Sequence, residues 1–248
     1  MRIRPFSLWV MRVIPANFEV GLKIMQEQKL NLSIYTLPEL IDIIKDEIDS
    51  YEYDFKKHLI LLKDQNFNPM GYVRLPLHYQ LNDHLDILDT QANALYLSVE
   101  SGNAAICMME GTENIYHTTF SAYMTRKKQG FSQIKYLNKK GKSRAGSRVR
   151  LAETVEFFEN INTTMNDLWE EFMIARLALD CNKTLLPYLL QSKVPFPVDK
   201  KDPVLYKIPL HIAQSNYTNL DAAIEKLKAP LLLFDEQYAD ELRDIFSV

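Results

Sequence analysis

Cysteine is scarce in this sequence of 248 residues. The two that occur, Cys107 and Cys181, lie far apart, and neither belongs to a CxxC pair with histidines nearby. This spacing excludes a zinc-finger type of site and favours two reduced, buried thiols. Histidines do not supply ligand spacing elsewhere, so we expect neither a metal site nor a cofactor.

Long apolar runs are also missing. The longest candidate is APLLLF at 229–234, far short of the ~20 apolar residues that a membrane-spanning helix needs. Near the N-terminus an apolar run ends at Arg12, and it is shorter than the roughly 7–15 residues of a secretory signal. We therefore expect a cytoplasmic protein that does not contact a membrane.

Acidic residues are absent from one stretch, residues 125–150, which we call the basic segment (TRKKQGFSQIKYLNKKGKSRAGSRVR). The rest of the chain holds all 32 acidic residues against 19 basic ones, and the net charge of the whole is −3. Such an asymmetry attracts polyanions to one segment while the remaining surface repels them. The ten cations of the basic segment are Arg126, Lys127, Lys128, Lys135, Lys139, Lys140, Lys142, Arg144, Arg148 and Arg150.

The order of the expected elements indicates the fold class. Alternating apolar residues and turn formers predict a three-stranded antiparallel meander over 94–124. A helical apolar stripe follows over 151–172, then a strand at 174–181, a short helix at 182–191, a strand at 203–212 and a helix at 218–227. We therefore expect an α+β fold with a mixed β-sheet that begins as an antiparallel meander and is flanked by helices.

The first 90 residues show a different pattern. Apolar residues at three and four spacing predict one or two amphipathic helices over 36–66, and turn formers at 67–90 suggest a connection. We expect a mainly helical N-terminal segment over residues 1–90 and a second domain over residues 91–248.

The basic segment is not a phosphate-binding P-loop. Gly141-Lys142-Ser143 matches the end of that motif, but the first glycine that it requires would fall at Tyr136. Glycines allow close approach of the backbone to a ligand, and Tyr123, Phe131 and Tyr136 offer faces on which unpaired bases can stack. This combination favours single-stranded RNA and gives no indication of DNA recognition. A solvated basic loop or a localisation tract is the alternative.

The motif RKKQGFSQ followed by KSRAGSRVR resembles the loop of the Vms-type release factors, which are peptidyl-tRNA hydrolases. Their catalytic domain is similar to the middle domain of the eukaryotic and archaeal termination factor. The match runs through Lys128-Gln129-Gly130-Phe131-Ser132-Gln133, with Phe131 where the family usually has a second glycine. The resemblance extends over about residues 90–230, without the zinc finger and ankyrin repeats of eukaryotic members, and it indicates a minimal, bacterial-like version.

The resemblance implies a ribosome-rescue enzyme whose partners are the large ribosomal subunit and peptidyl-tRNA. It implies that Gln133, Gly130 and Ser132 form the catalytic loop and that the ten cations bind RNA phosphates. Glutamine cannot accept a proton at neutral pH, so Gln133 would orient the nucleophile. That nucleophile is either water attacking the peptidyl ester or a ribose hydroxyl attacking the adjacent phosphate, and both stay open. A non-enzymatic module that binds tRNA or the ribosome and a metal-independent nuclease acting on free tRNA are the alternatives.

Overall fold

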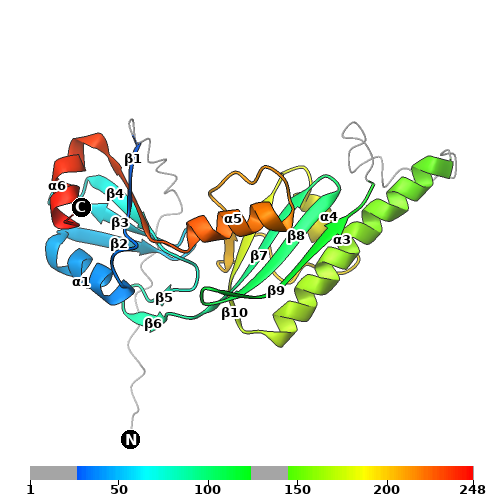
Figure 1. Ribbon diagram of the computed structural model, residues 1–248, viewed down its shortest axis with the longest axis horizontal. Coiled ribbons are helices and arrows are strands. Elements are labelled where there is room, and N and C mark those ends of the chain that lie inside the picture. The colour runs from blue at the N-terminus through cyan, green and yellow to red at the C-terminus, as the bar shows by residue number, and fades with distance from the viewer. Residues whose placement is uncertain (1–26, 124–144, 248) are drawn as a thin grey trace, which may run out of the picture.

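A computed structural model of the chain describes residues 27–123 and 145–247. Two five-stranded sheets lie one after the other along the long axis of the molecule (Figure 1). No helix in the described ranges combines the length and the apolar character that crossing a membrane requires.

The sheet at the right of Figure 1, which we call the second sheet, has the strand order β11-β10-β7-β8-β9. Its strands β7 (Asn93–Glu100), β8 (Asn103–Glu110) and β9 (Glu113–Ser121) form an antiparallel meander. The two remaining strands, β10 (Ile174–Cys181) and β11 (Leu205–Lys207), are parallel to β7 and β10 respectively. The expected α+β class, with a mixed sheet that begins as a meander, is confirmed.

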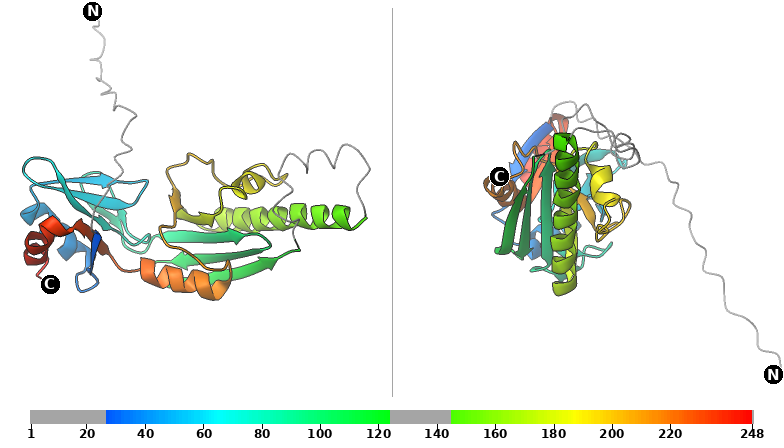
Figure 2. Two further views of the ribbon diagram at one scale, coloured as in Figure 1. Left: turned by 90° about the horizontal axis from the view of Figure 1, so that it is seen from above. Right: turned by 90° about the vertical axis from the view of Figure 1, so that its right-hand side faces the viewer.

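Helices cover both faces of the second sheet (Figure 2). Two of them, α3 (Ala145–Glu171) and α4 (Leu186–Leu190), pack on one face, and α5 (Tyr217–Leu227) packs on the other. Alternate side chains of β7 enter the two cores: Leu95 and Leu97 face α3, whereas Tyr96 faces α5. Because side chains alternate across a strand and helices cover both faces, the central strands are buried on both sides.

The sheet at the left of Figure 1, the first sheet, has the strand order β1-β12-β4-β3-β2. Its only long helix in the described residues is α1 (Leu37–Glu47), so the expectation of a mainly helical segment over 1–90 is wrong. The remaining elements of this half are β1 (Glu27–Asn31), β2 (Ser50–Asp54), β3 (Leu59–Lys63), β4 (Pro69–Arg74), β5 (Gln80–Leu81), β6 (Ile87–Asp89), β12 (Leu231–Asp235), η1 (Glu236–Tyr238) and α6 (Ala239–Ile245).

The helical spacing of buried apolar residues in α1 ends at Ile48. In the strands that follow, buried residues stand at every second position. Thr36 begins the helix through a capping box with Glu39. In the following hairpin Ile60 and Leu62 enter the core, while Lys63 contacts Glu52 across the strands on the other face. The sequence-based prediction extended the helix too far because this alternation follows directly on the helical stripe.

The last strand, β12, pairs with β1 and β4 and not with the second sheet. The core of the first sheet therefore contains Leu232, Phe234 and Phe246 as well as residues from α1 and β2 to β4. Gly71 of β4 lies against Leu233 and Phe234, where an added Cβ would come within 2.5 Å of the Leu233 carbonyl oxygen. We propose that the two sheets correspond to two domains, with the C-terminal strand and helix returning to the first.

A buried arginine joins the two sheets. Arg176 of β10 is 0% exposed, and its guanidinium stacks on the Phe55 ring with Cζ 3.6 Å from the ring centroid. It donates hydrogen bonds to the Phe55 carbonyl oxygen and to the Tyr53 hydroxyl. Tyr53 in turn contacts Nδ1 of His58 at 2.8 Å, and Nε2 of His58 lies 2.8 Å from the Pro76 carbonyl oxygen. That carbonyl can only accept, so Nε2 carries a proton, and Nδ1 faces Nη2 of Arg176 at 3.3 Å, which can only donate, so Nδ1 is an acceptor and His58 is neutral.

His58 is expected to make the protein less stable in acid. Burial, followed by the nearby Arg176 charge, lowers the pKa of His58 from 6.5 to about 3. Below pH 6.5 the unfolded chain binds one proton more at this residue than the folded chain does. Each further unit by which the pH is lowered therefore reduces the free energy of unfolding by about 1.4 kcal/mol. The loss continues until the pH reaches the folded pKa.

Urea unfolding at pH 7, 6 and 5 measures this effect. The variant His58→Asn, which tolerates the positive φ of 51° at this position, should lose that part of the pH dependence. The matched variant His84→Asn, at an exposed position, should retain it. Equal pH dependence in the wild type and in His58→Asn would contradict the assignment.

Candidate nucleic-acid interface

Most residues of the predicted site lie outside the described residues. These are Gly130, Ser132, Gln133, Arg126, Lys127, Lys128, Lys135, Lys139, Lys140, Lys142 and Arg144. Arg148 and Arg150 lie in the first two turns of α3, and their side chains are also outside the description. The two described elements that flank the segment 124–144 are β9 and α3.

Both flanking elements lie at the end of the second sheet that is remote from the first sheet (Figures 1 and 2). Strand β9 ends at Ser121, whose partner Asn103 begins β8 at this same end. Helix α3 starts at Ala145, and its first turns extend beyond the strands. The predicted catalytic motif is thus inserted between an edge strand and a long helix.

Helix α3 is held to the second sheet by an apolar stripe and by one buried amide. Phe157, Phe158 and Ile161 are among its buried side chains. Asn162 is 0% exposed, and its Nδ2 donates to the carbonyl oxygens of Leu189 and Val194, both at 2.8 Å. Since these bonds satisfy free carbonyls of the α4 region, the helix has a fixed position along the sheet.

A pocket of about 480 Å³ lies where β9 and α3 meet, next to the start of the segment 124–144. Tyr123, the last described residue before that segment, is 67% exposed, as a base-stacking surface requires. The pocket is lined by Thr119, Phe120, Ser121, Ala122, Tyr123, Glu153, Glu156, Phe157 and Asn160.

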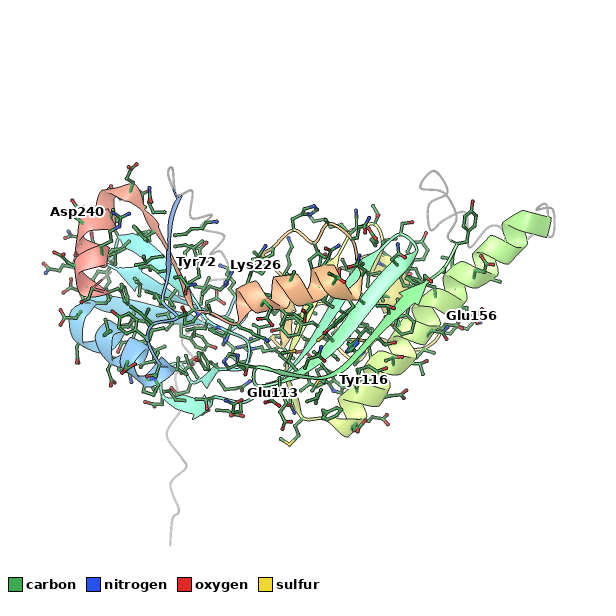
Figure 3. The ribbon with its side chains drawn as sticks, in the orientation of Figure 1. Tyr72, Glu113, Tyr116, Glu156, Lys226 and Asp240 are labelled. Atoms are coloured by element: carbon green, nitrogen blue, oxygen red, sulfur yellow. The ribbon has the colours of Figure 1, made fainter. Side chains whose placement is uncertain are left out.

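Two carboxylates in this pocket escaped the sequence analysis. These are Glu153 and Glu156, whose three-residue spacing brings both to the side of α3 that lines the pocket. Figure 3 shows Glu156 on α3, near the end of the sheet remote from the first sheet. Glu159 is different, because it contacts Lys193 at 3.4 Å. The spacing on the helix that directly follows the motif is the signal that could have identified the pair.

Removing these two carboxylates is expected to strengthen RNA binding. Like charges near a phosphate repel it, so the double variant Glu153→Gln/Glu156→Gln should bind single-stranded RNA about threefold more tightly at low salt. Fluorescence anisotropy with a labelled oligonucleotide measures the affinity. The control Glu170→Gln/Glu171→Gln, at the other end of α3, should change it little. Weaker binding in the first variant would show that the carboxylates organise the interface.

His117 is engaged with a neighbouring ring. It stacks on Tyr217 of α5, with ring centroids 4.0 Å apart and an interplanar angle of 20°. The Tyr217 hydroxyl also accepts a hydrogen bond from Asn114 at 2.9 Å. These contacts give His117 a structural role between β9 and α5. Within the two described ranges, no three His, Cys, Asp or Glu side chains are grouped so as to hold a metal ion.

Comparison with known proteins identifies related families. The model of a family described as "Bacteroidetes VLRF1 release factor" matches residues 94–231, which is more than half of the chain. The range includes the meander, the basic segment, α3 and α5. It agrees with the resemblance to the Vms-type release factors that the loop motif indicated. The sequence has no match among curated proteins.

Two solved structures are similar to this chain. One is the "Vms1 mitochondrial localization core", with 13% identity, a TM-score of 0.43, and coverage of 79% of this chain and 82% of that chain. The other is the archaeal translation termination factor aRF1, with 13% identity, a TM-score of 0.33, and coverage of 68% of this chain and 47% of that chain.

Proposed function

The chain belongs to the Bacteroidetes VLRF1 release factor family, and we propose that it frees nascent chains from stalled large ribosomal subunits by cutting at the CCA end of peptidyl-tRNA. The proposal makes it an enzyme of ribosome rescue, a peptidyl-tRNA hydrolase or a release factor that cleaves the tRNA 3′ end. The proposed reaction requires no cofactor.

One observation carries this proposal. The family match spans the motif Lys128 to Gln133, which follows β9 and precedes α3 in the sequence, and both of these elements reach the free end of the second sheet. A catalytic segment in this position can enter a narrow site on the ribosome while the rest of the protein stays outside. The basic composition of the segment suits a site whose walls are RNA.

The proposed chemistry depends on an uncharged side chain. The amide of Gln133 can accept a hydrogen bond from the nucleophile and donate one to the oxygen that develops charge, but it cannot remove a proton. Gly130 would allow the backbone to approach the RNA closely, and Ser132 would bind a phosphate or ribose oxygen. Phe131, where the family usually has glycine, would add a surface for stacking.

The cations would position the substrate. Phosphate contacts from lysine and arginine fix the register of an RNA without reading its sequence. We place Arg126, Lys127, Lys128, Lys135, Lys139, Lys140, Lys142, Arg144, Arg148 and Arg150 in this role. Binding should then weaken steeply as salt increases, because each contact releases counterions from the RNA.

The direct test uses purified large subunits that carry peptidyl-tRNA. Added protein should release the labelled nascent chain in a single-turnover reaction, and gel analysis of the tRNA product should reveal which bond was cut. An intact 3′ adenosine indicates hydrolysis of the ester, whereas a shortened end indicates cleavage of the phosphodiester. Binding without release would instead favour a non-enzymatic module. Cleavage of free tRNA at an equal rate would favour a nuclease that acts away from the ribosome.

A further inference from the structure

Among the residues that the structure describes, no helix packs on one face of the first sheet. Paired strands of the sheet place alternate residues on opposite faces, so Leu232 and Val73 enter the core beneath α1 and α6. Their neighbours Leu231 and Arg74, which are paired to each other, point to the other face. That face is directed toward β11 of the second sheet, and Figure 3 shows Tyr72 and Lys226 at the junction.

A cavity of about 770 Å³ occupies this junction. Its lining includes five cationic side chains and no acidic one: Lys29, Lys56, Lys57, Arg74 and Lys207. Lys57 contacts Asp54 at 3.4 Å, whereas Lys56 and Lys207 form no ion pair with any residue in the described ranges. In a chain of net charge −3, this gathering of cations lies outside the basic segment.

Arg74 is held in a fixed position in the wall of the cavity. Arg74 is 8% exposed, and its Nη2 donates to the Lys226 carbonyl oxygen at 2.8 Å. Its Nε is buried without a hydrogen-bond partner. Arg176 is also buried without a carboxylate partner among the described residues, but Arg74 differs because it lines the cavity. An anion in the cavity would offset the cost of burying the Arg74 charge.

The rest of the lining is aliphatic or aromatic. Leu59, Leu231, Leu233 and Tyr72 come from the first sheet, Leu205 and Tyr206 belong to β11, and Pro209 and Leu210 follow β11. A lining of this kind suits a ligand that combines an anionic group with a poorly hydrated one, within a volume typical of small-ligand sites. A nucleotide has this combination, because its phosphate suits the cations and its base suits the apolar floor.

We propose that this cavity holds one nucleotide of a single-stranded stretch of RNA, as a second RNA-binding site of the protein. Arg74, Lys56 and Lys207 contact the phosphates, and the base rests on the leucines. The proposal deepens the proposed function and rests on it for the identity of the RNA as part of a ribosomal or transfer RNA complex. The first turns of α3 lie at the free end of the second sheet, remote from this junction, so one RNA molecule must extend along the second sheet to contact both sites.

The experiment measures binding of a labelled 12-nucleotide single-stranded RNA to the full chain across a salt series. The double variant Lys56→Gln/Lys207→Gln changes two exposed side chains, so it should fold normally. Two lost phosphate contacts should lower the affinity about 20-fold at 0.1 M salt and reduce the slope of log K against log salt by about 1.4. The matched control Lys45→Gln/Arg243→Gln removes the same charge from α1 and α6, on the covered face, and should change the affinity less than twofold.

Two results would overturn the proposal. One is an unchanged salt slope in Lys56→Gln/Lys207→Gln, and the other is competition by free AMP that matches the oligonucleotide, which would make the cavity a small-molecule site. The release reaction is measured separately. If Lys56→Gln/Lys207→Gln lost RNA affinity but the wild type released no peptide, the cavity would be supported and the proposed function rejected. If the wild type released peptide but the double variant bound RNA normally, the proposed function would be supported and the cavity rejected.

Discussion

Replacing Gln133 with alanine is expected to slow peptide release at least 100-fold while leaving binding to the large subunit unchanged. Loss of one positioned hydrogen-bonding group at a developing charge costs catalysis on the order of 10²–10³. The amide contributes no charge, so the affinity that the cations provide should remain. Single-turnover release and a sedimentation assay for subunit binding separate the two quantities.

Two further variants sharpen this test. Gln133→Glu keeps the shape of the side chain but adds a negative charge beside RNA phosphates, so it should also be inactive and should bind more weakly. Gln191→Ala changes an exposed glutamine at the end of α4 and should behave as the wild type. Full activity in Gln133→Ala would remove this glutamine from the mechanism.

Replacing Arg176 with alanine is expected to destabilise the protein by about 3–5 kcal/mol. The change removes a desolvated stacking contact with Phe55, leaves the Phe55 carbonyl oxygen and the Tyr53 hydroxyl without their donor, and opens a cavity. Because Arg176 belongs to the second sheet and its partners to the first, the two sheets should also unfold less cooperatively. Calorimetry and urea unfolding followed by two probes measure both effects.

Arg176→Met provides the comparison, since it fills most of the volume and removes only the polar contacts. We expect a loss of about 1–3 kcal/mol for this variant, because the buried acceptors stay unsatisfied. If both variants were as stable as the wild type, the contacts of Arg176 would contribute nothing to the junction. A loss confined to Arg176→Ala would assign its role to packing alone.

The second sheet was predictable because its signals are local. The nearly continuous apolar runs of β7 and β8, the turns at Gly102 and Gly111 and the helical stripe of α3 can each be recognised from neighbouring residues. Buried strands between two helical layers show this regular pattern along the chain. The prediction of a mixed sheet was therefore confirmed.

The first sheet was missed for the opposite reason. Its strand β12 pairs with strands formed about 160 and 200 residues earlier, and nothing in the residues 231–235 indicates this partner. The alternation in β2 and β3 was masked by the helical period of α1 just before it. Contacts between distant segments do not appear in a local pattern.

The candidate site divides in a similar way. The motif Lys128 to Gln133 and its ten cations are contiguous in the sequence, so their chemistry could be inferred from their order, and their roles stay predictions. Glu153 and Glu156 came to the pocket only through the packing of α3 against β9. The cationic cavity combines Lys56, Arg74 and Lys207 from three separate regions, and the sequence alone gave no reason to group them.

The sequence by itself therefore determined the α+β class, the mixed sheet and the segment that carries the release-factor motif, because periodicity and charge are properties of neighbouring residues. The tertiary structure decided that β12 pairs with strands of the first sheet, that Arg176 joins the two sheets, and that a cavity rich in cations lies between them. These features depend on which faces of the sheets pack together once the strands have paired. Distant strands pair so that their apolar side chains are buried in a common core, which no local stretch of sequence specifies.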